Sequence, residues 1–181
     1  MAACEPARNA RYRRLFALES SGVQKMGRAL PTEPRTLPSA ARWLGFAGLA
    51  PQILLAVVII AGPARFGPAA GGAALAYSGA ILSFIGGAWW GLASHRQTDV
   101  HWGVWIAAVT PSLIAFAAIG VWAIGLSAGR SLLVIGASLI ATLVIDHKLA
   151  ASGVSPPGWL RLRVPLSLGL GSLTILIAIL S

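Results

Sequence analysis

The sequence is poor in charged residues and has a single cysteine. Only 10% of its 181 residues are charged, and Asp and Glu together number five. A soluble domain carries roughly a quarter charged residues, so this composition argues against a water-soluble fold. The lone Cys4 excludes an intramolecular disulfide framework and a cysteine-based metal site.

Sequence motifs for catalysis are also missing. The chain contains no glycine-rich phosphate-binding loop, no G-x-S-x-G and no H-E-x-x-H. Ser94 precedes His95, but adjacent residues in a sequence do not place a base against a nucleophile. We therefore predict that the protein is not an enzyme and that it binds no cofactor and no metal.

The sequence does contain long apolar stretches, and hydrophobic residues make up 56% of the chain. Five apolar stretches are each long enough to cross a bilayer, because about 18 helical residues cover roughly 27 Å. They are 44–61, 73–94, 102–126, 131–145 (the shortest) and 164–181. The sequence therefore predicts an all-α fold, an integral membrane bundle of five transmembrane helices over residues 41–181.

Proline and glycine refine these boundaries. Pro51 and Pro111 lie inside the first and third stretches, and each should kink its helix because proline lacks a backbone N–H donor. The prolines and glycines between Pro63 and Gly72 predict a loop before the second helix. Pro165 suits the first turn of the fifth helix.

Residues 1–40 differ in kind from the rest, because they are basic and hold no long apolar run. We expect a disordered tail on the cytoplasmic side. Two alternatives stay open. An arginine-rich, acid-poor leader also resembles a mitochondrial presequence, and a translation start at Met26 would leave the first 25 residues out of the protein.

The basic residues also predict the orientation. With the N-terminus in the cytoplasm, that side receives the basic tail together with Arg96, Lys148, Arg161 and Arg163. The opposite side receives only Arg65 and Arg130, so the positive-inside rule predicts an N-in, C-out orientation. The net charge of +9 suits anionic lipid headgroups. Nucleic acid is not an expected partner, because the basic residues lack interleaved aromatic side chains.

Small residues form a repeat in the second apolar stretch. Gly79, Ser83, Gly87 and Gly91 follow one another at four-residue spacing and predict a smooth ridge for close helix packing. Gly136 in the fourth stretch and Ser167 with Gly171 in the fifth are candidate contacts. The ridge would pack inside the bundle or form an interface with a second copy or another membrane protein.

Polar residues gather at one predicted end of the bundle. The residues of this cytoplasmic rim are Trp90, Asp146, Arg161 and Arg163, and we expect Asp146 to pair with one of the two arginines. His95, Asp99, His101 and His147 lie in loops at the same end. Histidine and aspartate can bind metal, but the spacing His-x5-His matches no specific ligand motif.

Several short motifs carry a resemblance to a known family. They are RWLG at 42–45, YSGAILSFIGG at 77–87 with WG at 90–91, PSL at 111–113 and WLRLR at 159–163. Together they resemble a bacterial multi-spanning family of unknown function whose eukaryotic relatives are the mitochondrial transmembrane protein sixty-nine group. The resemblance covers about residues 40–181 and implies an inner-membrane location, with no established activity. Family members are expected to carry His before Trp-Gly, where this chain has Trp89.

The favoured function is a structural or assembly role in the membrane. No Asp, Glu, Lys, Arg or His lies at the centre of any predicted span, which argues against ion-coupled transport. A passive path for a small neutral solute is the main alternative, and its lining would be Ser83, Thr110, Ser112, Ser138 and Thr142. A membrane enzyme that uses His95, Asp99 and His101 is a third hypothesis.

Overall fold

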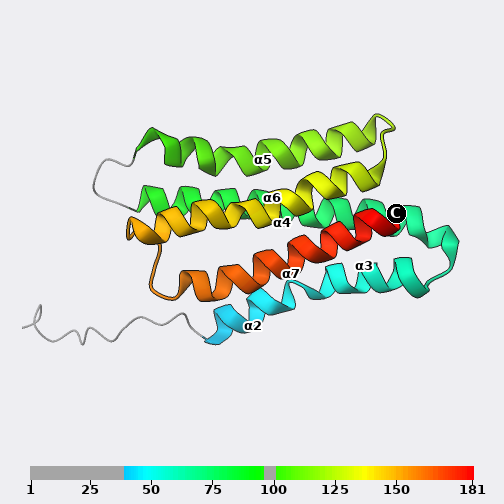
Figure 1. Ribbon diagram of the computed structural model, residues 1–181, viewed down its shortest axis with the longest axis horizontal. Helices are drawn as coiled ribbons and strands as arrows, with labels where there is room; N and C mark the ends of the chain where they lie inside the picture. Colours follow the sequence, from blue (N-terminus) through cyan, green and yellow to red (C-terminus); the bar gives the residue numbers. More distant parts are fainter. Residues whose placement is uncertain (1–38, 96–100) are drawn as a thin grey trace, which may run out of the picture. The chain divides into compact units, whose positions relative to one another are not determined.

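The computed structural model describes residues 39–95 and 101–181, and this part of the chain is helical without strands. Its elements are α2 (Ser39–Ala47), α3 (Ala50–Ala61), the short 3-10 helix η1 (Ala64–Phe66), α4 (Gly67–Ser94), α5 (Trp102–Ala123), α6 (Ala128–Ala151) and α7 (Trp159–Leu180). Figure 1 shows the long helices lying side by side, with α7 between α3 and α6. Five helical segments are long and apolar enough to span a membrane, which confirms the predicted all-α, five-span architecture.

The first span is broken where the sequence predicted a kink inside one helix. α2 ends at Ala47, the chain turns at Gly48 and Leu49, and α3 begins at Ala50. Pro51 therefore lies in the first turn of α3, where the missing N–H would have had no helical partner. The hydroxyl of Tyr77 donates a hydrogen bond to the carbonyl of Gly48 and fixes the break.

The expected loop before the second span is shorter than predicted. Pro68 lies in the first turn of α4, and Gly71 and Gly72 are already inside that helix. The reason is tertiary packing: a Cβ atom at Gly72 would lie 2.9 Å from the ring of Trp122. Gly72 is therefore a packing residue, and the interpretation of the glycine pair as a helix breaker was wrong.

The fourth and fifth spans are longer than predicted. α6 continues to Ala151, so Asp146 lies within the helix rather than at its end. α7 begins at Trp159, after Gly158 in the left-handed conformation (φ 83°), and Pro165 lies inside it instead of in its first turn. Charged residues near a helix end can remain helical and extend their side chains toward water, so charge did not mark these helix ends.

The predicted ridge of small residues divides between the inside and the outside of the bundle. Gly79 is buried, and a Cβ there would lie 3.0 Å from Ile119. Gly87 and Gly91 instead face outward, and a Cβ added at either position would meet no atom within 4 Å. An internal packing ridge through all four positions was therefore wrong. A four-residue step rotates by about 40° beyond one full turn, so such a row drifts around the helix.

The close contact between α4 and α5 uses a seven-residue spacing instead. Gly72, Gly79 and Gly86 face α5, and a Cβ at Gly86 would lie 2.3 Å from the carbonyl oxygen of Ala108. Seven residues span nearly two full helical turns, so these glycines stay on one side of the helix. A close approach of backbones replaces the hydrophobic drive that is missing between helices in lipid.

A second close contact joins α6 and α7. A Cβ at Gly136 would lie 3.0 Å from the carbonyl oxygen of Gly171, and the reverse distance is the same. The small residues expected to meet the α4 ridge therefore meet each other. The core of the described residues lies mainly among α4, α6 and α7, where Leu75, Leu82, Leu132, Ile135, Leu139 and Ile177 are fully buried.

Candidate functional site

A buried carboxylate near one end of the bundle binds side chains from two neighbouring helices. Asp146 is 0% exposed. Its Oδ2 lies 2.9 Å from Nε of Arg163, which forms an ion pair between α6 and α7. The sequence predicted a pair with Arg161 or Arg163, and the structure selects Arg163. Arg161 is exposed, because two positions along a helix point in nearly opposite directions.

Two indole groups complete the surroundings of the carboxylate. Nε1 of Trp89 donates a 2.8 Å hydrogen bond to Oδ1 of Asp146. Nε1 of Trp159 donates to the same oxygen at 2.9 Å. With Arg163, the carboxylate accepts three hydrogen bonds from α4 and α7. Hydrogen bonds to a charged group are the stronger kind, and here they replace the water that burial removes.

Arg163 has further contacts inside the protein. Its Nη2 donates to Oγ1 of Thr142 at 3.3 Å. Its guanidinium carbon lies 6.0 Å from the centre of a Trp159 ring, at the outer limit of a cation–π contact. Removing one partner of a buried ion pair costs about 3–5 kcal/mol, because the other charge is left uncompensated. This cluster of Trp89, Thr142, Asp146, Trp159 and Arg163, the buried charge cluster, therefore holds α4, α6 and α7 together.

Trp90, which was predicted to belong to the rim, lies outside this cluster. Its side chain is 49% exposed and packs edge-on against Trp105, with ring centres 4.8 Å apart. The neighbouring Trp89 was singled out only as a departure from an expected His. Trp89 is buried, and its indole N–H donates a hydrogen bond to Asp146. The N–H of a histidine imidazole can donate a hydrogen bond of the same kind. No signal in the sequence separates Trp89 from Trp90, because the buried face of α4, on which Trp89 lies seven residues after Leu82, is known only from the structure.

The histidines predicted near this end do not gather into a metal site. His101 caps α5, because its Nδ1 accepts a hydrogen bond from the backbone N–H of Gly103. His95 and His147 are exposed. Asp99 lies outside the described residues. Within 39–95 and 101–181, no three His, Cys, Asp or Glu side chains are close enough to hold a metal ion.

The hydroxyl groups proposed to line a solute path are only partly together. Thr110, Ser138 and Thr142 line a cavity of about 260 Å³ between α4, α5 and α6, and Ser83 and Ser112 do not. Each of the three hydroxyls donates to a carbonyl of its own helix. Fully buried leucine and isoleucine side chains fill the core described above. Among the described residues the polar path is therefore not continuous.

A second buried polar contact was not predicted from the sequence. Gln52 on α3 is 0% exposed. Its Nε2 donates a 3.1 Å hydrogen bond to Oγ1 of Thr174, which itself donates to the carbonyl of Leu170. The Oε1 atom of Gln52 has no hydrogen-bond partner. The available signal was a glutamine directly after Pro51, in the predicted span 44–61 that holds no other polar side chain.

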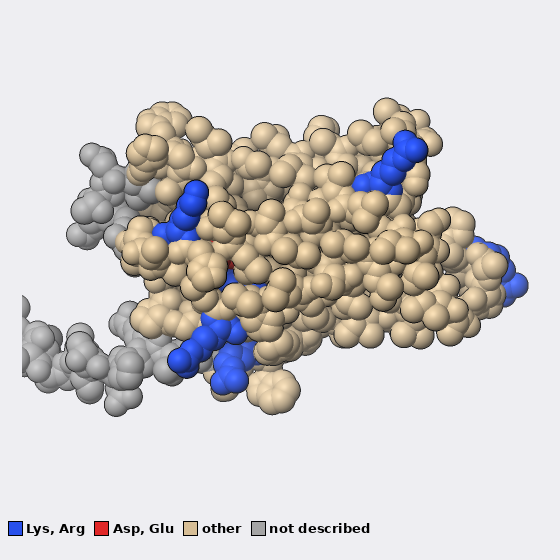
Figure 2. Space-filling view, in the orientation of Figure 1, with Lys and Arg blue, Asp and Glu red and all other residues tan. Residues whose placement is uncertain are grey.

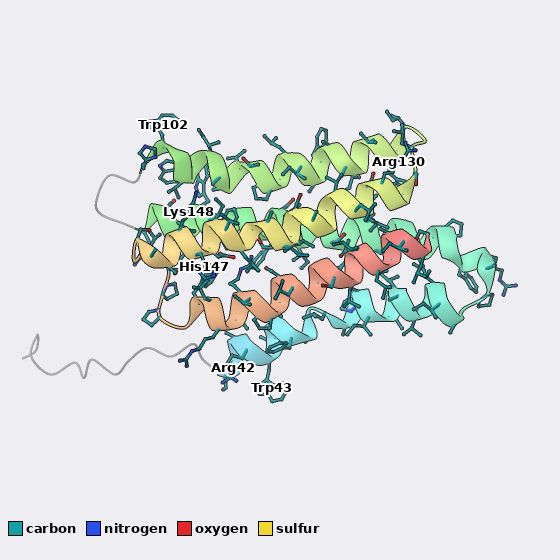
Figure 3. All side chains as sticks on the ribbon, viewed as in Figure 1. Arg42, Trp43, Trp102, Arg130, His147 and Lys148 are labelled. Carbon is teal, nitrogen blue, oxygen red and sulfur yellow. The ribbon has the colours of Figure 1, made fainter. Side chains whose placement is uncertain are left out.

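The charged residues of the described chain lie near its two ends. Figure 2 shows blue Lys and Arg side chains at both ends of this face, with uncharged surface between them. In Figure 3, Arg42, His147 and Lys148 lie toward one end together with Trp43 and Trp102, and Arg130 lies at the other. This distribution matches helices that cross a bilayer, because charged side chains are costly in its centre.

A comparison with known families covers most of the chain. A family model described as a protein of unknown function (DUF3429) matches residues 37–179, which includes the five candidate spans almost to the end of α7. No curated protein and no solved structure matches the sequence.

Proposed function

The chain belongs to the DUF3429 family of proteins of unknown function, and we propose that it is a structural or assembly component of a bacterial inner membrane rather than an enzyme. The observation that carries this proposal is the outward face of α4. Gly87 and Gly91 have open space beside them, although they belong to the same four-residue repeat as the packed Gly79. Small residues on a membrane helix allow another helix to approach closely.

The buried charge cluster supports a structural role over catalysis. Asp146 has no exposed surface, and its two oxygens already accept three hydrogen bonds from Trp89, Trp159 and Arg163. A general acid or base must reach the proton that it transfers. Asp146 in this arrangement positions helices, and its charge is committed to Arg163.

The proposal includes the orientation and the location. Arg42 and Lys148 lie toward one end of the bundle and Arg130 toward the other (Figure 3). This distribution supports an N-in, C-out topology by the positive-inside rule. We include a bacterial inner membrane in the proposal because the motifs at 77–91 and 159–163 resemble a bacterial multi-spanning family whose eukaryotic relatives are the mitochondrial transmembrane protein sixty-nine group.

A variant of the outward face tests the assembly role. Gly87→Leu should release a partner that is crosslinked to the wild-type protein in its own membrane, without lowering the thermal stability of the chain. Gly120→Leu on α5 is the matched control, because that glycine also has no atom within 4 Å of an added Cβ. If both variants keep the crosslinked partner, the face of α4 at Gly87 is not the interface.

A passive path for a small neutral solute is the alternative. The cavity that gathers Thr110, Ser138 and Thr142 supports it, and the fully buried Leu82, Ile135 and Leu139 oppose it. Reconstituted liposomes distinguish the two functions: solute-dependent swelling above that of protein-free liposomes supports the path, and equal swelling supports the assembly role.

A further inference from the structure

A lateral slot lies between α2, α4 and α7. Its volume is about 490 Å³, within the range of roughly 300–1,000 Å³ that is typical of ligand pockets. Leu44 on α2 and Phe84 on α4 both line it, and each is 73% exposed, so the slot opens on the outer surface of the bundle. α2 buries no residue of its own, which leaves this space between it and α4. A slot that opens sideways is accessible from the lipid phase.

The slot is long, and its lining is mostly apolar. The lining includes Trp159 near the start of α7 and Leu170 farther along the same helix. Leu170 lies eleven positions after Trp159 on the helix, so the slot follows α7 for about 17 Å. Arg163, near the Trp159 end, and Ser167, one turn farther in, are its charged and hydroxyl-bearing lining residues. This is the lining that an acyl chain with a polar group at one end requires.

Ser167 is the feature that packing does not explain. The residue is 2% exposed, and its Oγ has no hydrogen-bond partner. Other helical hydroxyls, including those of Ser78, Ser138 and Thr174, donate to a carbonyl of their own helix four residues back. A buried hydroxyl without a partner is unfavourable, because it has lost its hydrogen bonds to water and gained none in the protein. An acceptor that enters the slot would satisfy it.

Basic residues flank the same end of the slot. Arg42 follows the lining residue Ala41 on α2. Arg161 lies in the first turn of α7, at the same end of the slot but on the side of the helix away from the lining residues Trp159 and Arg163. Both arginines are exposed, and neither forms an ion pair with any residue that the structure describes. Arg163 is already neutralised by Asp146. Arg42 and Arg161 therefore provide positive charge where the headgroup of a bound amphiphile would lie.

We propose that the lateral slot binds one anionic phospholipid. The acyl chain lies along α7 toward Leu170, a glycerol ester carbonyl accepts a hydrogen bond from Ser167, and the phosphate lies between Arg42 and Arg161. Basic pockets between membrane helices bind anionic headgroups in this way. The lipid site involves residues other than Gly87 and Gly91, so it stands or fails independently of the assembly role.

Native mass spectrometry of the delipidated full chain with added lipid tests the site. The two probes are dioleoyl phosphatidylglycerol and dioleoyl phosphatidylcholine, which share their acyl chains. The wild type should retain one phosphatidylglycerol per chain and bind phosphatidylcholine roughly tenfold or more weakly. The variant with Arg42→Gln and Arg161→Gln should lose this preference, because each arginine near an anionic group contributes a factor of roughly five.

A variant that fills the slot separates it from the rest of the surface. Ala88→Phe places a ring in the slot from α4, and Ala80→Phe is its matched control on an exposed position of the same helix outside the slot. Ala88→Phe should abolish the lipid adduct and Ala80→Phe should retain it. Ala41→Phe fills the slot from α2, which has no buried residue, and gives the same answer if Ala88→Phe does not fold.

The proposal is overturned by any of three results. They are equal binding of the two lipids by the wild type, a lipid adduct that persists when the slot is filled in a folded variant, and a preference for phosphatidylglycerol that survives the loss of both arginines. Ser167→Ala adds a test of the ester contact, since it should weaken binding severalfold without changing the preference between headgroups.

Discussion

Two adjacent glycines on α4 should respond in opposite ways to the same substitution. A Cβ at Gly86 would lie 2.3 Å from the carbonyl oxygen of Ala108, whereas a Cβ at Gly87 would meet no atom within 4 Å. Real Cβ atoms essentially never approach another atom closer than 3.0 Å, so Gly86→Ala forces α4 and α5 apart. Gly87→Ala changes only the outer surface.

The size of the difference follows from packing. Overpacking a core costs about 1–3 kcal/mol, and the cost at Gly86 should lie at the upper end because a backbone carbonyl cannot rotate away. At Gly87 the change should be neutral or stabilising by at most about 1 kcal/mol, which is the helix propensity gained from glycine to alanine. The two variants should therefore differ by about 2–4 kcal/mol.

Unfolding in detergent, followed by tryptophan fluorescence, measures this difference. Gly86→Ala should unfold at a lower temperature than the wild type, and Gly87→Ala at the same temperature or slightly higher. Equal stability of the two variants would mean that α4 and α5 do not approach through Gly86. A loss of stability at Gly87 alone would restore the four-residue ridge as the internal contact.

Four further predictions concern the polar contacts and the orientation. Asp146→Asn should cost about 3–5 kcal/mol of stability in the same unfolding assay, because Arg163 loses its counter-charge. Adding Arg163→Met to this variant should recover most of the loss. A wild-type melting curve for Asp146→Asn would refute the buried ion pair. Trp89→Phe should cost about 1–3 kcal/mol and Trp89→His less, since imidazole retains an N–H donor; equal losses would show that the hydrogen bond to Asp146 contributes little. Gln52→Leu should be nearly neutral, because Thr174 keeps its hydrogen bond to the carbonyl of Leu170. Thr174→Val should destabilise the protein by about 1–3 kcal/mol, because it leaves the buried amide of Gln52 without a partner. A larger loss of stability for Gln52→Leu than for Thr174→Val would refute the role given to this hydrogen bond. With Cys4 replaced by Ser, a cysteine at position 130 should react with a membrane-impermeant maleimide in intact cells and one at position 148 should not, and the reverse would invert the topology.

The number of spans could be predicted from the sequence because it depends on apolar length alone. The inward faces of the helices could not, because lipid-facing side chains are as apolar as buried ones. Leu82 is fully buried and Phe84 is 73% exposed, yet both are large apolar residues of the same apolar stretch. For the same reason the packing glycine is Gly86 rather than Gly87, and the cluster tryptophan is Trp89 rather than Trp90.

The polar residues were predictable as a pair and not as a cluster. Asp146 is the only acidic residue of its span, so a nearby arginine was a natural partner on charge alone. The two indole donors come from positions 57 residues before it and 13 residues after it, and only the tertiary fold brings them to one oxygen. Gln52 was not predicted because a neutral amide carries no charge to mark it as a site.

Native mass spectrometry of the tagged full-length protein, extracted in mild detergent from its own membrane, tests the assembly role most directly. An assembly component should give a discrete heteromeric mass that contains this chain and a second membrane protein. A monomer or a homo-oligomer alone would contradict it and favour the path for a neutral solute.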